Sequence, residues 1–210
     1  MATDLQPPVS RRGDPVWELA EYTWPRQGEW TDAEYLKLDR SRVELVDGCL
    51  EFLPMGEDIH QEAHDFLVSL LRGILGRGYV YSSGYRLKVP GGFREPDVIA
   101  TRDRSTFTRS FADAADFVAE VISPGQSNRE RDEVTKPVVY AAAGVSEYWI
   151  IDPQPRTIRQ LVLDGDTYRD AGTFGLGDAI TSTAIEGFVV RVGELFGSTA
   201  RSESEARDGD

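Results

Sequence analysis

Two apolar, strand-like runs of this chain each contain one carboxylate. Asp97 precedes Val98-Ile99-Ala100, and Glu120 lies between Phe117-Val118-Ala119 and Val121-Ile122. An unpaired carboxylate inside a strand is costly to desolvate, so a strand interior usually excludes acids. Two such carboxylates in neighbouring strands predict a positive group between them. A hard divalent cation, with oxygen ligands and room left for phosphate oxygens, is the natural candidate.

The length and composition of the chain are those of a globular protein. At 210 residues it suits one domain with tails, or at most two small domains, and an apolar content of 40% is enough to build a core. We expect a poorly ordered N-terminal segment at 1–28, a single domain at 29–197 and a disordered acidic tail at 198–210.

The sequence carries no signal of a membrane or exported protein. No apolar run reaches membrane-spanning length, and residues 1–14 lack the apolar core of a secretory signal. Cys49 is the only cysteine, which excludes disulfide frameworks and thiolate zinc sites within one chain. We therefore expect a cytoplasmic location and no membrane partner.

The formal net charge of −13 restricts the functions that fit this chain. Proteins that coat nucleic acid need lysines and arginines facing phosphate, so the charge argues against binding through bulk electrostatics. A nucleic-acid enzyme with a local basic rim stays compatible with it. Each arginine taken alone is explained at least as well as a solvated loop charge. The arginines near the two carboxylate-bearing runs are Arg94, Arg102, Arg104, Arg109, Arg129 and Arg131.

Hydrophobic periodicity and turn residues predict the order of the helices and strands. Thr31 and Glu34 have the spacing of a capping box, and Asp47-Gly48 between alternating apolar flanks is a strong hairpin signal. Apolar residues recur at helical spacing after Asp58, a candidate cap. We expect helices at 31–38, 59–75 and 132–143, a hairpin at 43–53, strands at 79–89, 93–101, 117–122 and 147–153, a polar loop at 124–131, and short strands over 157–197.

The middle of the chain thus reads helix, three strands, helix, strand. Asp97 falls on the second of these strands and Glu120 on the third. Consecutive strands linked by short turns are antiparallel, whereas a strand reached through a helix can lie parallel to its predecessor. The predicted fold class is therefore α/β, with an N-terminal helix–hairpin and a C-terminal β extension around this core.

Several motifs accompany this order of elements. They are Glu44-Leu45-Val46-Asp47-Gly48, His60, Glu95-Pro96-Asp97-Val98, Glu120-Val121-Ile122-Ser123-Pro124, the four-residue steps Asp132, Lys136 and Tyr140, and Ala143-Gly144-Val145-Ser146-Glu147-Tyr148-Trp149-Ile150-Ile151-Asp152-Pro153. The order of elements resembles the PD-(D/E)xK nuclease superfamily, and the motifs are similar to those of the Uma-two family, the putative restriction endonucleases. The resemblance covers roughly residues 30 to 195 and implies a restriction-endonuclease-like core.

The resemblance also implies metal-dependent hydrolysis of a phosphodiester in a nucleic acid, with DNA as the expected substrate. Asp97 and Glu120 would bind Mg²⁺, for which Mn²⁺ could substitute, and the main-chain carbonyl of Val121 would add another oxygen. Glu44 would complete the metal site or bind a second ion. The metal would polarise the phosphate, lower the pKa of a bound water and stabilise the developing negative charge.

One position departs from the superfamily pattern. The superfamily's lysine normally lies two residues after the Glu, where this chain has Ile122. Lys136 is the candidate replacement, because the start of the next helix can fold back over the strand. The resemblance to the Uma-two family implies a lysine of this helix as well. Tyr140 lies one turn further on the same helical face, and Tyr140 and His60 are candidate auxiliary residues.

Structural roles compete for the same residues. Asp97 could cap a strand edge or pair with Arg94, and Lys136 could be a solvated helix charge. For His60, packing or hydrogen bonding is favoured over metal ligation, and His64 is expected at the surface.

Two other functions stay open. The chain could be a catalytically lapsed module that binds nucleic acid or protein without cleavage, a reading that Ile122 and the acidic charge favour. It could also be a different metal hydrolase with a small-molecule substrate, which would predict a closed pocket rather than an open basic-rimmed groove. A homodimer would suit cleavage of both DNA strands, although nothing in the sequence demands one.

Overall fold

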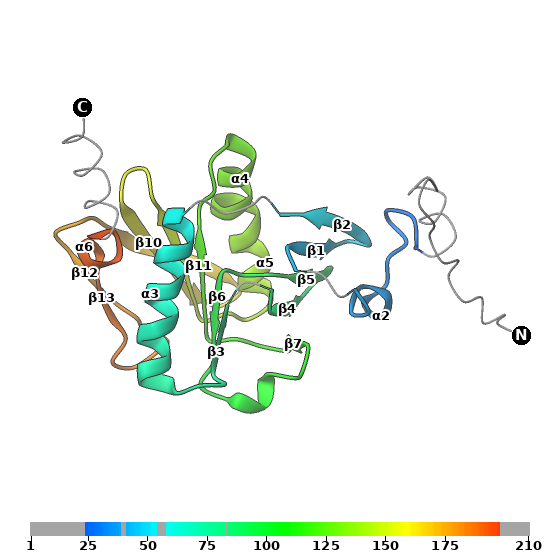
Figure 1. Ribbon diagram of the computed structural model, residues 1–210, viewed down its shortest axis with the longest axis horizontal. Helices are drawn as coiled ribbons and strands as arrows, with labels where there is room; N and C mark the ends of the chain where they lie inside the picture. The colour runs from blue at the N-terminus through cyan, green and yellow to red at the C-terminus, as the bar shows by residue number, and fades with distance from the viewer. Residues whose placement is uncertain (1–23, 39–40, 54–57, 83, 198–210) are drawn as a thin grey trace, which may run out of the picture.

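Two sheets dominate the computed structural model, which describes residues 24–38, 41–53, 58–82 and 84–197. A six-stranded central sheet lies beside a five-stranded sheet, and a two-stranded sheet packs at the far side of the central one (Figure 1). Of the segment 1–28, for which we expect little order, residues 1–23 lie outside the described residues, and so does the tail 198–210. Among the described helices, none is long and apolar enough to cross a membrane.

The central sheet contains the predicted core of the fold. Its strand order is β11-β10-β9-β8-β6-β3. β3, β6 and β8 are antiparallel neighbours, and β9 pairs with β8 in parallel. The predicted order of helix, three antiparallel strands, helix and strand is therefore confirmed, and the α/β class with it. The strands are β3 (Val80–Ser82), β6 (Val98–Ala100), β8 (Phe117–Val121), β9 (Glu147–Asp152), β10 (Thr157–Asp164) and β11 (Thr167–Phe174).

Helix α3 (Asp58–Leu75) covers one face of the central sheet (Figure 1). Its residues Leu67 and Leu71 are buried in one apolar cluster with Phe117 of β8. His64 is buried as well, so its expected surface position is wrong: it lies on the inner face of α3, one turn before these leucines. The C-terminal elements join the same cluster: β12 (Ala179–Thr181), β13 (Val189–Arg191) and α6 (Val192–Leu195).

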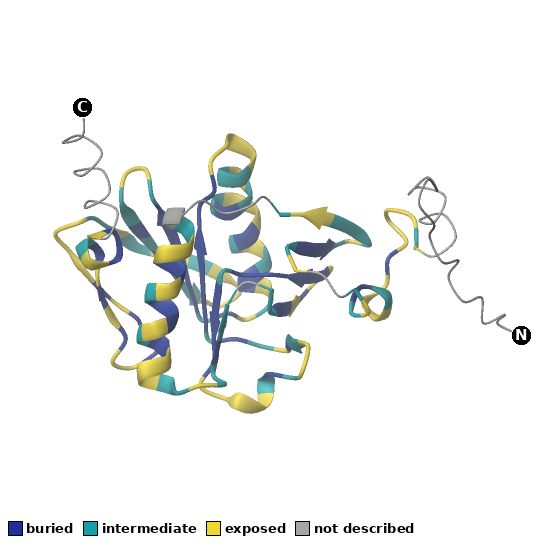
Figure 2. Ribbon diagram, in the orientation of Figure 1, coloured by how far each residue is buried: buried dark blue, intermediate teal, exposed yellow. Residues whose placement is uncertain are grey.

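The crossover from β8 to β9 covers the opposite face, so that the central strands are buried between two layers (Figure 2). It comprises α4 (Gln126–Glu130), the π-helical turn η2 (Arg131–Thr135) and α5 (Lys136–Ala142). The polar loop expected at 124–131 is therefore wrong, and the helix expected at 132–143 begins with a wide turn. Pro137 accounts for the turn: it has no amide hydrogen, and its ring collides with the carbonyl four residues back in a regular helix.

The second sheet has the order β2-β1-β5-β4-β7 and contains the predicted hairpin. Asp47 and Gly48 connect β1 to β2 with positive φ angles of 47° and 77°, the conformation that a tight hairpin turn requires. A 3₁₀ turn, η1 (Arg104–Thr106), precedes the last strand. The strands are β1 (Val43–Val46), β2 (Cys49–Phe52), β4 (Arg86–Val89), β5 (Gly92–Arg94) and β7 (Phe111–Ala112).

Helix α2 (Asp32–Tyr35) packs beside this second sheet. Thr31 and Glu34 form the predicted capping box, but the helix is shorter than the range 31–38 that we expected. The chain before α2 also contacts the hairpin, because the amides of Gly28 and Trp30 donate to the Gly48 carbonyl at 2.8 Å and 3.1 Å. Trp24 stacks on Trp30 with ring centroids 5.4 Å apart.

Two predicted strands are each divided between the two sheets. The run 79–89 forms β3 in the central sheet and β4 in the second sheet, and the run 93–101 forms β5 and β6 in the same way. Each break falls at a residue that interrupts the hydrogen bonding between neighbouring strands. Gly84 has a positive φ of 91°, and Pro96 has no amide hydrogen to donate. The second break places Asp97 where the two sheets meet.

Candidate active site

Asp97 and Glu120 lie opposite each other across two antiparallel strands. β6 and β8 pair with Val98 opposite Ala119, and continuing this register by one residue places Asp97 opposite Glu120. Directly opposed residues have Cβ atoms roughly 4.5–5.5 Å apart, and like charges in such a pair are destabilising. The strand pairing therefore creates a position at which a cation is stabilising.

Helix α5 supplies an ammonium group to this position. Lys136 Nζ lies 2.7 Å from Glu120 Oε1, and the Tyr140 hydroxyl donates a hydrogen bond of 2.6 Å to the same oxygen. Both side chains project from one face of α5 because they are a single turn apart. Val118 and Ile122 share the apolar cluster beneath α5 with Tyr140. Ile122 is therefore a core residue, and the ammonium reaches Glu120 from the helix that covers it.

Lys136 is shared among three carboxylates. Besides Glu120, its Nζ lies 3.2 Å from Asp132 Oδ1 and 3.9 Å from Glu44 Oε1. The four residues are between 1% and 3% exposed, so their charges interact with little screening by water. Asp132 lies in the π-helical turn, four residues before Lys136 and on the same side of the crossover.

Burial and neighbouring charges shift the pKa values in this cluster. Burial has the largest effect on Glu120 and, with repulsion from Asp97, Asp132 and Glu44, raises its pKa to about 8, although Lys136 opposes the shift. Burial lowers the pKa of Lys136, but its attraction to the carboxylates outweighs burial and holds the pKa above its ordinary value. Glu120 thus retains a proton near neutral pH that a further cation would displace.

Asp97 is held by a side chain of helix α3 and by the main chain of β8. His60 Nε2 of α3 lies 3.2 Å from Asp97 Oδ2, and the Val121 amide donates a hydrogen bond of 2.9 Å to the same oxygen. Burial raises the pKa of Asp97, but His60, Lys136 and the Val121 amide outweigh it and bring the pKa below its ordinary value. For His60, burial lowers the pKa, and Asp97 more than reverses this. Asp97 is therefore the ionised member of the opposed pair.

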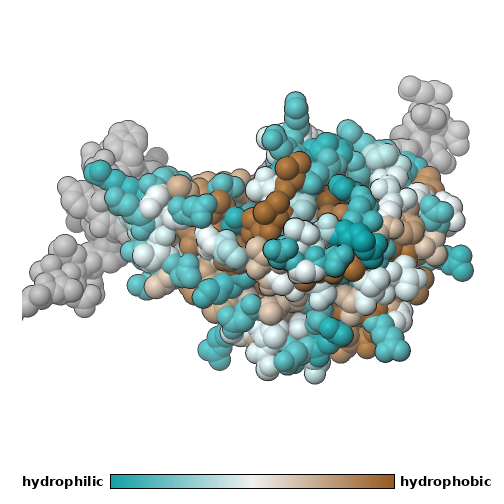
Figure 3. Space-filling view, turned by 180° about the vertical axis from the view of Figure 1, so that it is seen from behind, coloured by the Kyte–Doolittle hydropathy of each residue, from teal (hydrophilic) through white to brown (hydrophobic). Residues whose placement is uncertain are grey.

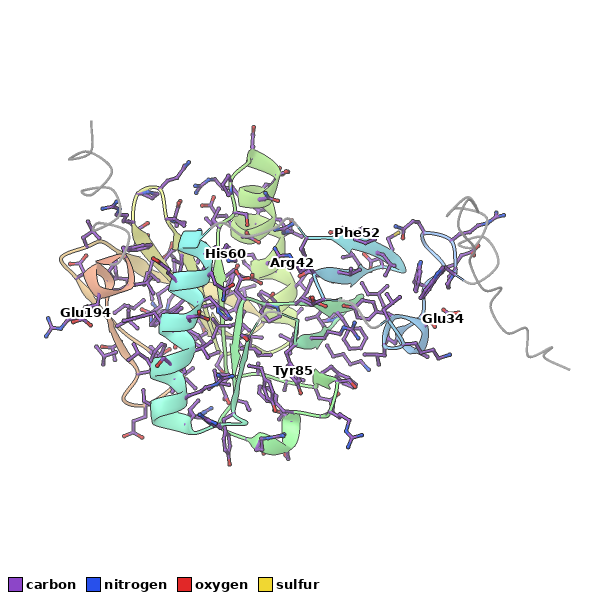
Figure 4. All side chains as sticks on the ribbon, viewed as in Figure 1. Glu34, Arg42, Phe52, His60, Tyr85 and Glu194 are labelled. Carbon is purple, nitrogen blue, oxygen red and sulfur yellow. The ribbon has the colours of Figure 1, made fainter. Side chains whose placement is uncertain are left out.

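The two carboxylates open onto one small cavity of about 20 Å³. A larger cavity of about 320 Å³ adjoins it, since His60 and Ser123 line both. Figure 4 shows Arg42 and His60 next to each other in this region, between α3 and the β1–β2 hairpin. The small cavity is lined by Arg42, Leu53, His60, Glu95, Asp97, Glu120, Val121, Ser123, Arg131, Asp132 and Lys136.

Most of the candidate residues from the sequence meet at this cavity, but Glu44 stands apart. Glu44 contacts the group through Lys136, and its carboxylate also accepts a hydrogen bond of 3.0 Å from the Glu95 amide. Arg94, considered above as a partner of Asp97, lies 3.8 Å from Glu44 instead. The predicted residues that line the cavity are Asp97, Glu120, Val121, Lys136 and His60, with Tyr140 bonded to Glu120.

Four charged residues at the cavity are not among the candidate site residues from the sequence: Arg42, Glu95, Arg131 and Asp132. Asp132 carries a usable signal, because Lys136 and Tyr140 follow it at four-residue steps. Glu95 directly precedes the Pro96-Asp97 pair, whereas no pattern in the sequence singles out Arg42. The Arg42 amide donates a hydrogen bond of 2.5 Å to Glu95 Oε2, a contact between residues 53 positions apart.

The oxygen ligands at this cavity fit a hard divalent cation whose coordination is completed by oxygens of the substrate. Within the described ranges, no three His, Cys, Asp or Glu side chains are arranged to hold a metal ion by themselves. Asp97 and Glu120 nevertheless line one cavity together with Val121, and the raised pKa of Glu120 shows that its present partners do not fully stabilise its ionised form. Mg²⁺ is commonly held by one or two protein carboxylates, with water and phosphate oxygens completing its coordination.

Comparison with solved structures supports the fold assignment. The chain is similar to a putative nuclease belonging to DUF820 from Anabaena variabilis ATCC 29413, with a TM-score of 0.62 and 17% sequence identity over 80% of this chain and 97% of that chain. At this identity the likeness concerns the fold alone.

Comparison of the sequence with protein families gives a more specific result. No curated protein matches the chain. The family Uma2, described as putative restriction endonuclease, matches residues 32–193. This range contains both opposed carboxylates and the whole of α5. The chain therefore belongs to the Uma2 family of putative restriction endonucleases.

Proposed function

We propose that the protein is a metal-dependent endonuclease that hydrolyses phosphodiester bonds, with DNA as its substrate. The observation that carries this proposal is the shared cavity of Asp97, Glu120 and Lys136, which come from two strands and a helix far apart in the chain. Two carboxylates and an ammonium around one cavity can bind both a hard cation and a phosphate. The family membership supports the same reaction class.

Asp97 and Glu120 would hold Mg²⁺, or Mn²⁺ in its place, beside the main chain of Val121. The bound ion would supply a Lewis acid that polarises the phosphate and acidifies a water molecule. Glu120 must lose its proton to become a ligand, so cation binding releases a proton and strengthens as the pH rises toward 8.

The remaining polar residues act on these groups. Lys136 keeps its proton because the surrounding carboxylates raise its pKa, and a permanent ammonium stabilises negative charge that develops on the phosphate. Tyr140 orients Glu120, and His60 orients Asp97. For Glu44 we propose an electrostatic role through Lys136 rather than direct metal ligation, because Lys136 is its contact with the group.

DNA would reach this site through local charge rather than through the protein as a whole. The net charge is −13, and hydrophilic side chains dominate the face seen from behind, with apolar groups scattered among them (Figure 3). Arg42 and Arg131 line the cavity and provide positive charge there. A two-fold homodimer would place two such sites on opposite DNA strands, and light scattering of the purified protein tests for it.

The test is a cleavage assay with supercoiled plasmid DNA and with labelled RNA, in Mg²⁺, in Mn²⁺ and in EDTA. We expect cleavage of DNA that EDTA stops and that Asp97→Asn, Glu120→Gln and Lys136→Met each abolish. The matched control is Lys88→Met, which removes a half-exposed lysine of β4. Equal activity of the wild type and the three site variants would show that the activity comes from elsewhere.

A non-cleaving module is the second candidate, and one observation favours it. The Lys136 ammonium already lies 2.7 Å from Glu120 and 3.2 Å from Asp132, within reach of the carboxylates that a cation would use. Tight DNA binding by the wild type, without cleavage in either metal, would support this function over hydrolysis.

A further inference from the structure

Arg42 brings a guanidinium group to the cavity, and its binding partner there is not assigned by the mechanism above. It directly precedes β1 and lines the same cavity as Asp97, Glu120 and Lys136. Its Nε is buried and has no hydrogen-bond partner within the described part of the protein. Buried donors are rarely left unpaired, so this nitrogen indicates a partner other than the residues that the structure describes.

The other cations at the cavity are occupied. Lys136 is in contact with Glu120 and Asp132, and Arg131 Nε lies 3.4 Å from Asp132 Oδ1. Among the described residues, the Arg42 side chain forms no ion pair. It differs in this from both neighbours, although all three face the same small space.

The backbone at Arg42 is held in a conformation that an arginine does not favour. Its φ is +65°, a region in which residues with a Cβ atom are uncommon and which glycine adopts without steric cost. Two hydrogen bonds fix it there: the Arg42 amide donates to Glu95 Oε2 at 2.5 Å, and the Leu53 amide donates to the Arg42 carbonyl at 2.9 Å. A strained residue fixed at both main-chain groups is consistent with a side chain kept for its function.

We infer that Arg42 binds a non-bridging oxygen of the substrate phosphodiester. This rests on the proposed function of the cavity and adds to it the residue that recognises the phosphate. A guanidinium presents donors in a planar fork that matches two phosphate oxygens, whereas an ammonium offers a point charge. Lys136 is neutralised by the carboxylates around it, whereas Arg42 has no carboxylate partner among the described residues. Arg42 is therefore the cation that binds the phosphate.

Two substitutions separate phosphate recognition from folding. Arg42→Gly removes the guanidinium and suits the positive φ, so the thermal midpoint should be unchanged or higher. Arg42→Lys keeps the charge and loses the fork. The matched control is Arg102→Gln, which removes an exposed arginine beyond the opposite end of β6.

The measurement is the affinity for a fluorescein-labelled DNA duplex in EDTA, followed by anisotropy over a range of salt concentrations. We expect Arg42→Gly to weaken binding about tenfold and to reduce the slope of log K against log salt by about 0.9, the effect of one lost phosphate contact. Arg42→Lys should keep the slope and lose part of the affinity, and Arg102→Gln should match the wild type.

Unchanged affinity and slope in Arg42→Gly would overturn the inference, and so would a wild type that binds no DNA. If Arg42→Gly loses its cooperative unfolding transition, Arg42→Met replaces it, and equal binding by Arg42→Met and Arg42→Lys is then the contrary result. The cleavage assay is read separately. Arg42-dependent binding without any cleavage would support this inference and contradict the proposed hydrolysis. Cleavage with wild-type KM in Arg42→Gly would support the proposed hydrolysis and contradict this inference.

Discussion

Glu120 and Glu147 are buried carboxylates near opposite ends of the paired strands β8 and β9. Glu120 lies beside Ile150 in the parallel ladder, and Glu147 lies beside Phe117. Their exposures are 3% and 0%, so burial does not distinguish them. The two carboxylates differ in their hydrogen-bond and ion-pair partners.

Glu147 is surrounded by neutral donors. Its two oxygens accept hydrogen bonds from the Trp149 indole at 2.6 Å, the Gln160 amide at 2.5 Å and the Ser182 hydroxyl at 2.6 Å, and from the main-chain amides of Thr183 and Ala184 at 2.8 Å each. The carboxylate thus ties the chain after β12 to β9 and β10 of the central sheet. A charge satisfied in this way needs no further ligand.

Glu120 is bound by an ammonium and a phenol, and it faces other acids. The contrast teaches that a buried carboxylate in a strand is not in itself a functional signal. We propose that partners which do not fully stabilise the ionised carboxylate, as at Glu120, mark a site for a cation. A full set of neutral donors, as at Glu147, is that of a structural junction.

The largest expected effect is on activity at Glu120. Glu120→Gln should lower the rate of DNA cleavage by about 10³-fold or more, about 4 kcal/mol of transition-state stabilisation, because it removes a proposed metal ligand without changing the shape of the side chain. Single-turnover cleavage in Mg²⁺ measures it. Lys88→Met again serves as control, and activity within tenfold of the wild type would remove the distinction between the two acids.

The second effect is on stability at Glu147. Glu147→Ala should lower the free energy of unfolding by about 3 kcal/mol, because it leaves several buried donors without an acceptor. Urea denaturation followed by tryptophan fluorescence measures it, with Asp170→Asn on the exposed side of β11 as control. Cleavage per folded molecule should stay near the wild-type value. A loss of less than about 1 kcal/mol would mean that the donors find water instead.

The third effect is a pH dependence that belongs to Glu120. Its pKa is about 8 in the folded protein against 4.5 ordinarily, so the folded state holds the proton more tightly than the unfolded state. In EDTA, this group's contribution to stability should be complete below pH 4.5 and fall by about 4 kcal/mol as the pH rises to 8.

Glu120→Gln, which cannot ionise, provides the control for this pH dependence. The difference in unfolding free energy between the wild type and this variant should change with pH over the same window. A difference that is constant from pH 5 to pH 8 would contradict the raised pKa. Saturating Mg²⁺ should flatten the wild-type curve, because the ion replaces the proton.

The smallest effect compares the loss of one donor from each acid. Tyr140→Phe and Ser182→Ala each remove a single hydroxyl, bonded at 2.6 Å to Glu120 and to Glu147 respectively. Each should cost about 1 kcal/mol of stability. Tyr140→Phe should also slow cleavage several-fold, whereas Ser182→Ala should not; equal rates for the two variants would argue against a positioning role of Tyr140.

Local and periodic features of the fold could be predicted from the sequence. The capping box at Thr31, the Asp47-Gly48 turn, helix α3 and the buried strand β9 all follow from residues within a few positions of each other. The split of the runs 79–89 and 93–101 could not, because an extended run looks the same whether one sheet or two sheets receive it. Gly84 and Pro96 mark the breaks only once the second sheet is known.

For the site, the sequence by itself determined which residue types were present: two acids embedded in apolar strands, and a lysine and a tyrosine one turn apart on a helix. Only the tertiary structure decided their partners. The β6–β8 register opposes Asp97 to Glu120, the crossover lays Lys136 over Glu120, and the loop before β1 brings Arg42 to the same cavity. These contacts join segments 16 or more positions apart, so they depend on how sheets pair and pack, and no local pattern of residues encodes that.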